Sequence, residues 1–93
     1  MPGSSEQILE QIVVLPKHLH ARPAGQVAQV AARYLDTTIE LVADGRSVNA
    51  RSILAVMGLG AVAGSEVRVR AAGGGDPTAA TREIIEILTS AEE

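Results

Sequence analysis

The 93-residue sequence contains no cysteine, tryptophan or phenylalanine, and Tyr34 is its single tyrosine. Without cysteine the chain has no disulfide, no thiolate metal site and no thiol nucleophile. With so few aromatic rings it lacks the stacking surfaces that bind single-stranded nucleic acids. A net charge of −3 also disfavours DNA and RNA as partners. The core must therefore be built from aliphatic side chains, and nucleic acid is not an expected ligand.

Long apolar runs are absent as well. No stretch approaches the roughly 20 apolar residues of a membrane-spanning helix, and residues 1–6 lack the basic start and apolar core of a secretory signal. We therefore expect a cytoplasmic protein without membrane insertion. The length predicts a single domain over residues 1–93, with residues 1–6 as a flexible N-terminus.

The spacing of apolar residues predicts seven elements in the order β-α-β-β-α-β-α. Aliphatic or alternating segments predict strands at 8–15, 37–42, 46–49 and 66–71. Helical spacing predicts helices from Ala21 to Leu35, at 52–57 and from Pro77 to Ala91. Asp44-Gly45 is a strong signal for a two-residue hairpin turn. The order predicts an α+β fold, a mostly antiparallel sheet with helices on one face.

Both histidines of the chain, His18 and His20, lie between the first strand and the first helix. A helix beginning near Ala21 places His20 at its N-terminus, where unpaired amides and the helix dipole favour an anion. Arg22 adds a guanidinium able to bind phosphate oxygens, and Lys17 is a further donor. No Asp or Glu interrupts residues 11–35 or 45–65, so both segments can meet an anion or an acidic partner. The pattern favours a nucleophilic imidazole that accepts a phosphoryl group.

Other interpretations of this stretch remain open. A histidine near a helix start can be a solvated or capping residue. His18 and His20 could form half of a metal site, but the segment offers no third histidine, cysteine or carboxylate, so we expect no metal. A Ser-His-Asp triad would need a nucleophile motif that the sequence does not show. A module that binds an anion or a partner without covalent chemistry is the alternative from another functional class.

Two motifs resemble one known family. His20-Ala21-Arg22-Pro23-Ala24 resembles the active-site signature of HPr, the histidine-containing phosphocarrier of the bacterial phosphoenolpyruvate:sugar phosphotransferase system. The stretch from Asp44 to Gly60, a hairpin leading into a short helix that opens with a serine, is similar to the family's second signature. The resemblance covers residues 8–90 and implies an open-faced β-sandwich, with four antiparallel strands covered on one side by three helices.

The resemblance implies a phosphocarrier rather than a turnover enzyme. His20 would be phosphorylated on Nδ1 by phosphoenzyme I and would pass the phosphoryl group to enzyme IIA or IIB domains for sugar uptake. Arg22 would balance the phosphate charge, Pro23 would hold the first turn, and backbone amides at Ala21 and Arg22 would bind the phosphate beside Lys17. The protein would be monomeric and would need no cofactor.

The second motif carries two further expectations. Ser52 matches a regulatory serine that an HPr kinase/phosphorylase modifies in many Gram-positive bacteria, although it could serve only as a helix N-cap. Val56 is expected to face the core. Ile53, Leu54 and Met57, with Leu59 as a further candidate, are too many for so short a helix to bury. With Arg51 they would form an exposed docking patch for enzyme I and IIA domains, bordered also by Arg22 and Arg33. The alternative is that these apolar residues all belong to the core.

One departure from the family concerns the active-site loop. His18 stands where the family usually has glycine, so it could shift the loop or add a second titrating group. The spacing from His20 to Ser52 is about one residue longer than usual. The Ser52 motif favours the sugar system over a nitrogen-regulatory paralogue or a carrier for a dihydroxyacetone kinase, which would use the same chemistry.

Overall fold

The computed structural model describes residues 8–90, so the predicted flexible segment 1–6 and Ala91 lie outside the described residues. The seven elements follow the predicted order: β1 (Ile8–Val14), α1 (Ala21–Arg33), β2 (Thr37–Ala43), β3 (Arg46–Asn49), α2 (Ile53–Gly58), β4 (Glu66–Gly73) and α3 (Pro77–Thr89).

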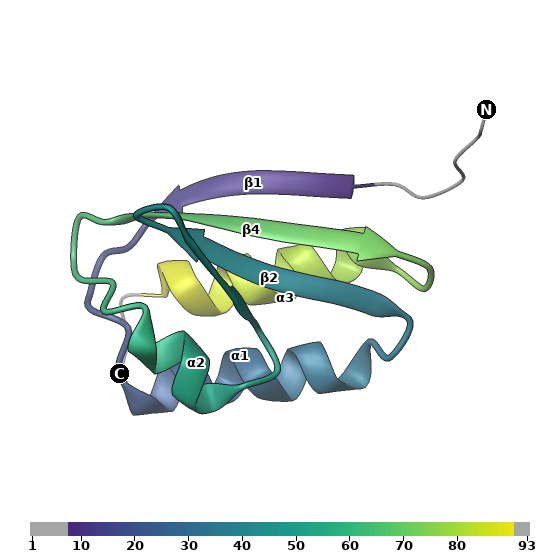
Figure 1. Cartoon of the computed structure of the whole chain (residues 1–93), viewed down its shortest axis with the longest axis horizontal. Coiled ribbons are helices and arrows are strands. Elements are labelled where there is room, and N and C mark those ends of the chain that lie inside the picture. Colours follow the sequence, from purple (N-terminus) through teal and green to yellow (C-terminus); the bar gives the residue numbers. More distant parts are fainter. Residues whose placement is uncertain (1–7, 91–93) are drawn as a thin grey trace.

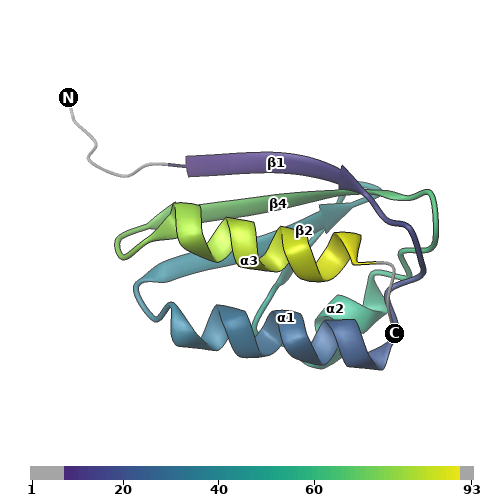
Figure 2. The same cartoon turned by 180° about the vertical axis from the view of Figure 1, so that it is seen from behind.

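The four strands form one sheet in the order β1-β4-β2-β3, and every neighbouring pair is antiparallel. All three helices lie on the same side of this sheet, as both views show (Figures 1 and 2). The predicted α+β architecture, an open-faced β-sandwich, is confirmed. No helix in the described part of the chain is long and apolar enough to cross a membrane.

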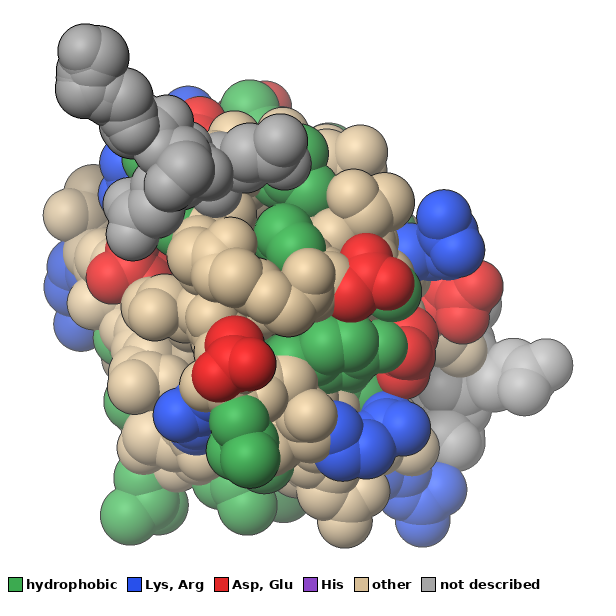
Figure 3. Space-filling model, turned by 90° about the vertical axis from the view of Figure 1, so that its right-hand side faces the viewer, with side chains coloured by type: hydrophobic (Ala, Val, Ile, Leu, Met, Phe, Trp, Pro, Cys, Tyr) green, Lys and Arg blue, Asp and Glu red, His purple; other side chains and the backbone are tan. Residues whose placement is uncertain are grey.

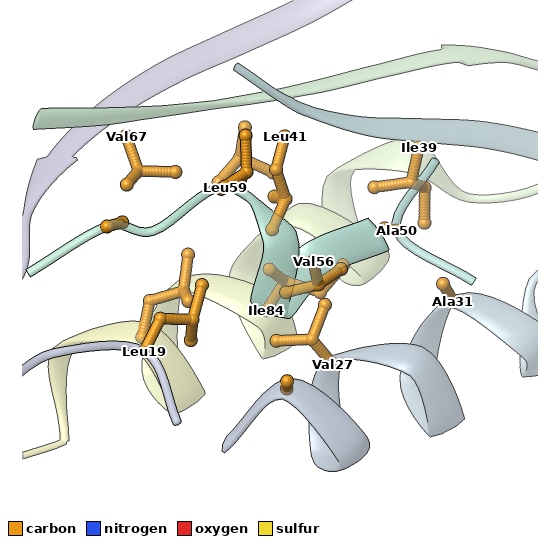
Figure 4. Packing of buried hydrophobic residues seen from close by; sticks show 14 of the residues in the cluster. Leu19, Val27, Ala31, Ile39, Leu41, Ala50, Val56, Leu59, Val67 and Ile84 are labelled. Carbon is orange, nitrogen blue, oxygen red and sulfur yellow. The ribbon is translucent and has the colours of Figure 1, made fainter. Parts of the chain in front are cut away.

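The core lies between the sheet and the helices and is almost entirely aliphatic. The inward side chains of β4, Val67, Val69 and Ala71, are fully buried, while Glu66, Arg68 and Arg70 face outward as their alternation predicts. Figure 4 shows these layers meeting around the helix residues Val27, Val56 and Ile84. Because the core contains no aromatic ring, many small side chains must fill it by close packing.

The turn and capping residues predicted from the sequence occupy the expected connections. Asp44 and Gly45 both have positive φ, 53° and 76°, as a tight hairpin between β2 and β3 requires. Asp76 caps α3 by accepting a hydrogen bond from the Ala79 amide at 3.1 Å, and Pro77 occupies the first turn. These local signals are confirmed.

Several predicted boundaries, at both ends of the 52–57 helix and at the ends of the strands predicted at 37–42 and 66–71 among others, differ from the observed ones by one or two residues. Two of the differences change where a side chain lies. α1 ends at Arg33, because Tyr34 leaves the helical conformation, and Leu35 is 76% exposed instead of completing the buried stripe. Val30 is buried on α1 in its place. β1 ends at Val14, one residue before the predicted boundary, because Leu15 turns into the core.

Candidate functional site

The loop between β1 and α1 is anchored by two buried leucines. Leu15 is 2% exposed, and its amide and carbonyl pair with Ser65 O and the Gly64 amide at 3.0 and 2.8 Å. Leu19 is 7% exposed, and its amide donates to Ala61 O at 3.0 Å. Figure 4 shows Leu19 directed into the core from this loop. The anchors hold the intervening residues in place beside the start of α1.

His20 occupies the N-cap of α1, as the sequence predicts. Its backbone is extended (φ −97°, ψ −168°), and its carbonyl accepts the Ala24 amide at 3.1 Å. Its imidazole makes no capping hydrogen bond, so the side chain is not tied to the backbone amides of the helix start. Pro23 has no N–H, which leaves the amides of Ala21 and Arg22 at the open end of the helix. With no acid in the first turn, this end of α1 is suited to an anion.

A cavity of about 180 Å³ opens beside the imidazole of His20. Its charged and titratable lining among the described residues is Lys17, His18, His20 and Arg22, with no Asp or Glu. The remaining lining is apolar or neutral: Leu15, Leu19, Pro23, Gln26, Ile87, Leu88 and Ser90. The structure therefore brings together the predicted acceptor, its predicted charge partner and the predicted lysine around one cavity large enough for a phosphoryl group.

His18 is the second imidazole of this cavity. The ring centroids of His18 and His20 are 4.9 Å apart, and the ring planes are tilted by 54°. Within residues 8–90, no group of three or more His, Cys, Asp or Glu side chains is arranged to hold a metal ion. Among the described residues, the imidazole pair therefore has Lys17 and Arg22 as its charged neighbours on the cavity wall.

The C-terminal end of α3 forms the far wall of the cavity. Figure 2 shows α3 running antiparallel to α1, so the last turn of α3 lies beside the first turn of α1. Ile87, Leu88 and Ser90 contribute this wall. Sequence reasoning missed these residues and Gln26, because no local motif links the end of α3 to a loop about 70 positions earlier. The helical spacing of α3 predicts that Ile87 and Leu88 face inward, but it gives no sign of the loop that they lie against.

The opposite end of the molecule looks different. Figure 3 shows acidic, basic and apolar side chains interspersed there, with no histidine visible. At that end the Arg33 guanidinium pairs with Glu83 at 3.0 Å, linking α1 to α3. Among the described residues, a cavity lined by Lys17 and Arg22 without Asp or Glu is therefore a feature of the β1–α1 end.

Ser52 is the N-cap of α2, and its Oγ accepts the Ala55 amide at 3.1 Å. The side chain is half-buried. The structural role that the sequence predicts for this serine is confirmed, while its modification is a separate question.

α2 divides its apolar residues between the core and solvent. Val56 and Leu59 are buried, at 0% and 5% exposure. The α2 patch, defined as Ile53, Leu54 and Met57, is 45%, 82% and 39% exposed. The predicted division is confirmed, and Leu59 belongs to the core and not to the patch. An exposed set of apolar side chains on one short helix is typical of a surface that contacts another protein.

Arg51 acts first as a structural cap. Its guanidinium and Nε donate to backbone carbonyls where α1 ends, at 3.1–3.5 Å, and the acceptors are Ala31, Tyr34, Leu35 and Thr37. Ala31 O also accepts the Tyr34 amide at 3.3 Å, and Tyr34 O accepts the Thr37 amide at 3.1 Å. The arginine therefore adds a charged donor to these carbonyls and opposes the negative end of the helix dipole. A partner that docks on Arg51 would therefore meet a guanidinium that already donates to these carbonyls.

Comparison with known proteins points to one family. Residues 9–90 match the family model described as "PTS HPr component phosphorylation site". The chain is 47% identical over 51 residues to the phosphocarrier protein HPr of Treponema pallidum, an alignment covering 55% of this chain and 57% of that protein. The chain therefore aligns with little more than half the length of this curated relative.

Solved structures extend the similarity over most of the chain. The crystal structure of HPr from Bacillus anthracis is 28% identical, with a TM-score of 0.79 over 88% of this chain and 98% of that one. The solution structure of Crh, the catabolite repression HPr of Bacillus subtilis, is 33% identical, with a TM-score of 0.69 over 94% of this chain and 99% of that one. The matched model, the shared fold and the imidazole at a cationic helix start agree: the chain belongs to the HPr family of phosphocarriers of the phosphotransferase system.

Proposed function

We propose that His20 accepts a phosphoryl group and passes it on, and that the protein is a relay without turnover chemistry of its own. A neutral ring nitrogen of His20 attacks the phosphorus of a phosphorylated donor. The bond between phosphorus and the donor breaks as the new N–P bond forms, and the donor keeps the bonding electrons. The reverse displacement on an acceptor protein regenerates the imidazole. The observation that carries this proposal is an imidazole at the N-cap of α1 that makes no capping bond and faces a cavity lined with cations.

The neighbouring groups stabilise the transferred charge without forming a bond that must later break. Arg22 supplies a permanent positive charge, and the amides of Ala21 and Arg22 supply N–H donors at the positive end of α1. Lys17 adds a third cationic contact on the cavity wall. Pro23 fixes φ in the first turn and removes a competing N–H, so the phosphoryl group meets the two amides that precede it.

We assign enzyme I as the donor and enzyme IIA or IIB domains as acceptors, in keeping with membership of the HPr family. Such a carrier would act in the cytoplasm as a monomer. The α2 patch supports a docking role because its three exposed apolar side chains lie on a helix that packs against α1. The same chemistry would serve a nitrogen-regulatory or dihydroxyacetone kinase relay, and those alternatives differ from the sugar system only in the partner that accepts phosphate fastest.

We further propose Ser52 as a regulatory phosphorylation site for an HPr kinase/phosphorylase. A phosphate at the N-cap of α2 would meet the open amides of that helix, which makes the modified state stable. It would also place negative charge beside the α2 patch and so reduce binding of an acidic-rimmed partner. The similarity to a structure named for catabolite repression supports this assignment.

Intact-mass spectrometry tests the central step. The protein is incubated with phosphoenolpyruvate, magnesium and enzyme I, and a gain of one phosphate is expected. The phosphate should be lost in acid, survive base and be absent from His20→Ala. His18→Ala is the matched control, because it removes the neighbouring imidazole and keeps the acceptor. No added mass, with an enzyme I that phosphorylates another carrier, would contradict the relay and favour a non-covalent binding module.

A further inference from the structure

We infer that His18 is a second phosphoryl-contacting residue, whose imidazolium stabilises the phosphoryl group on His20 and thereby makes the transfer equilibrium dependent on pH. This inference rests on the proposed function, since it requires that His20 carry phosphate. It concerns a residue that stands where the family usually has glycine.

The backbone of the loop places the two imidazoles on one side. Side chains in extended chain alternate, so residues i and i+2 face the same way. Leu19, between the histidines, is 7% exposed and directed into the core, and His20 has extended dihedral angles. His18 and His20 must therefore both face away from the core, and both line the same cavity with ring centroids 4.9 Å apart.

The second imidazole lies within reach of a transferred phosphoryl group. A phosphoryl group bonded to a His20 nitrogen extends beyond the ring into the cavity, which measures about 180 Å³. A ring whose centre lies 4.9 Å from that of His20 is close enough for its N–H to donate to a phosphoryl oxygen after a side-chain rotation. His18 is exposed, so the core does not restrict that rotation.

The charges around His18 determine what the phosphoryl group changes. From the loop the facing groups are Lys17 and His20, from α1 Arg22, and the end of α3 contributes no charged side chain among the described residues. The phosphoryl group would bring between one and two negative charges at neutral pH among these groups. An opposite charge within about 4–6 Å favours the protonated imidazole.

The sign of the pH dependence follows from linkage. If phosphate on His20 favours protonated His18, then protonated His18 favours phosphate on His20 by the same factor. Histidine changes charge between about pH 5 and 8, so the stabilisation is present at pH 6 and lost at pH 8.5. For an exposed ion pair we expect a factor of about ten in the equilibrium constant, at the low end of what a neighbouring charge produces.

The test compares the wild type with His18→Gly and His18→Gln. Glycine restores the usual family residue, while glutamine keeps a hydrogen-bonding side chain without a titrating charge. The equilibrium constant for phosphoryl exchange with enzyme I is measured for all three proteins from pH 6 to 8.5. Since every variant keeps His20 and differs only at position 18, the ratio of wild type to variant isolates His18. The expected ratio is about ten at pH 6 and about one at pH 8.5, for both variants.

Nitrogen-15 NMR of the imidazoles gives a second readout, because the chain has only two histidines. The midpoint of the His18 titration should move to higher pH when His20 is phosphorylated. A ratio that does not change with pH, or an unmoved midpoint, would overturn the inference while leaving the carrier function standing. Phosphate bonded to His18 would overturn both the inference and the assignment of His20 as the acceptor. Absence of phosphate from all three proteins would overturn both.

Discussion

The hydroxyl of Tyr34 donates a hydrogen bond to the carboxylate of Glu83, and the same carboxylate pairs with Arg33 at 3.0 Å. Tyr34 is the C-cap of α1, and Glu83 lies on α3. The two long helices are thereby linked at the end of α1 away from the cavity, while their other ends form opposite walls of it. The contacts that link α1 to α3 thus lie at one end of α1, and the cavity lies at the other end.

Tyr34→Phe should lower the melting temperature by a few degrees and leave phosphate acceptance unchanged. The hydrogen bond to Glu83 is the main cause that raises the pKa of Tyr34 above its usual 10.0, with partial burial and the negative charge of Glu83 adding to it. A raised pKa stabilises the fold below pH 10 and loses that effect as the pH rises through the folded-state pKa. Thermal unfolding of both proteins at pH 8 and 11 should give a difference that shrinks at the higher pH; a constant difference would refute this role.

Arg51→Ala should destabilise the fold by about 1–2 kcal/mol, because carbonyls at the end of α1 lose a charged donor. Arg51→Lys should recover only part of the loss, since an ammonium cannot reproduce the planar guanidinium fork. Denaturant titration of both variants measures the effect. Arg82→Ala is the matched control: Arg82 is an exposed arginine on α3, and none of the four carbonyls that accept from Arg51 belongs to α3. Equal losses at the two sites would contradict the capping role.

Substitutions at Ser52 should separate stability from docking. Ser52→Ala removes the bond to the Ala55 amide and should cost about 1 kcal/mol of stability. Ser52→Asp keeps a capping oxygen and places a negative charge at a helix start, so its stability should match the wild type. Its phosphorylation by enzyme I should nevertheless be several-fold slower, measured as initial rate against carrier concentration. An unchanged rate would remove this end of α2 from the docking surface.

Leu54 and Val56 offer the clearest contrast within one helix. Leu54→Ser alters a side chain that is 82% exposed and should change stability by less than about 0.5 kcal/mol. It should weaken binding to enzyme I by removing apolar contact area. Val56→Ala should cost about 1–3 kcal/mol, because it leaves a cavity in the core, and binding of the folded fraction should persist. Calorimetry of folding and of enzyme I binding distinguishes the two effects, and a reversed pattern would reject the α2 patch.

The sequence was sufficient for the order of elements because each carries its own local signal. Asp44-Gly45 tolerates the positive φ that a tight turn between two alternating segments requires, and Asp76-Pro77 marks a helix start by hydrogen bonding and by fixed φ. The site was equally local, since Lys17, His20 and Arg22 lie within six consecutive positions. The residues that line the cavity from this loop are therefore neighbours in the sequence as well as in space.

What sequence reasoning missed depends on contacts between distant segments. Arg51 attracted attention as a surface charge, but its donors reach carbonyls near the end of α1, about 14 to 20 positions earlier in the chain. The wall of the cavity formed by α3 required knowing that α1 and α3 are antiparallel neighbours. Leu35 was assigned to a buried stripe because periodicity does not reveal where a helix ends.

Leu19 determines which side chains of the β1–α1 loop face the core. Since its side chain is buried and its amide is held by Ala61 O at 3.0 Å, inserting or deleting one residue beside it would turn an imidazole into the core and the leucine toward solvent. Positions 18 and 20, on either side of Leu19, do not have to fit into the core. The residue at position 18 can therefore change, and with it the acid–base character of this loop, without disturbing the packing that orients His20.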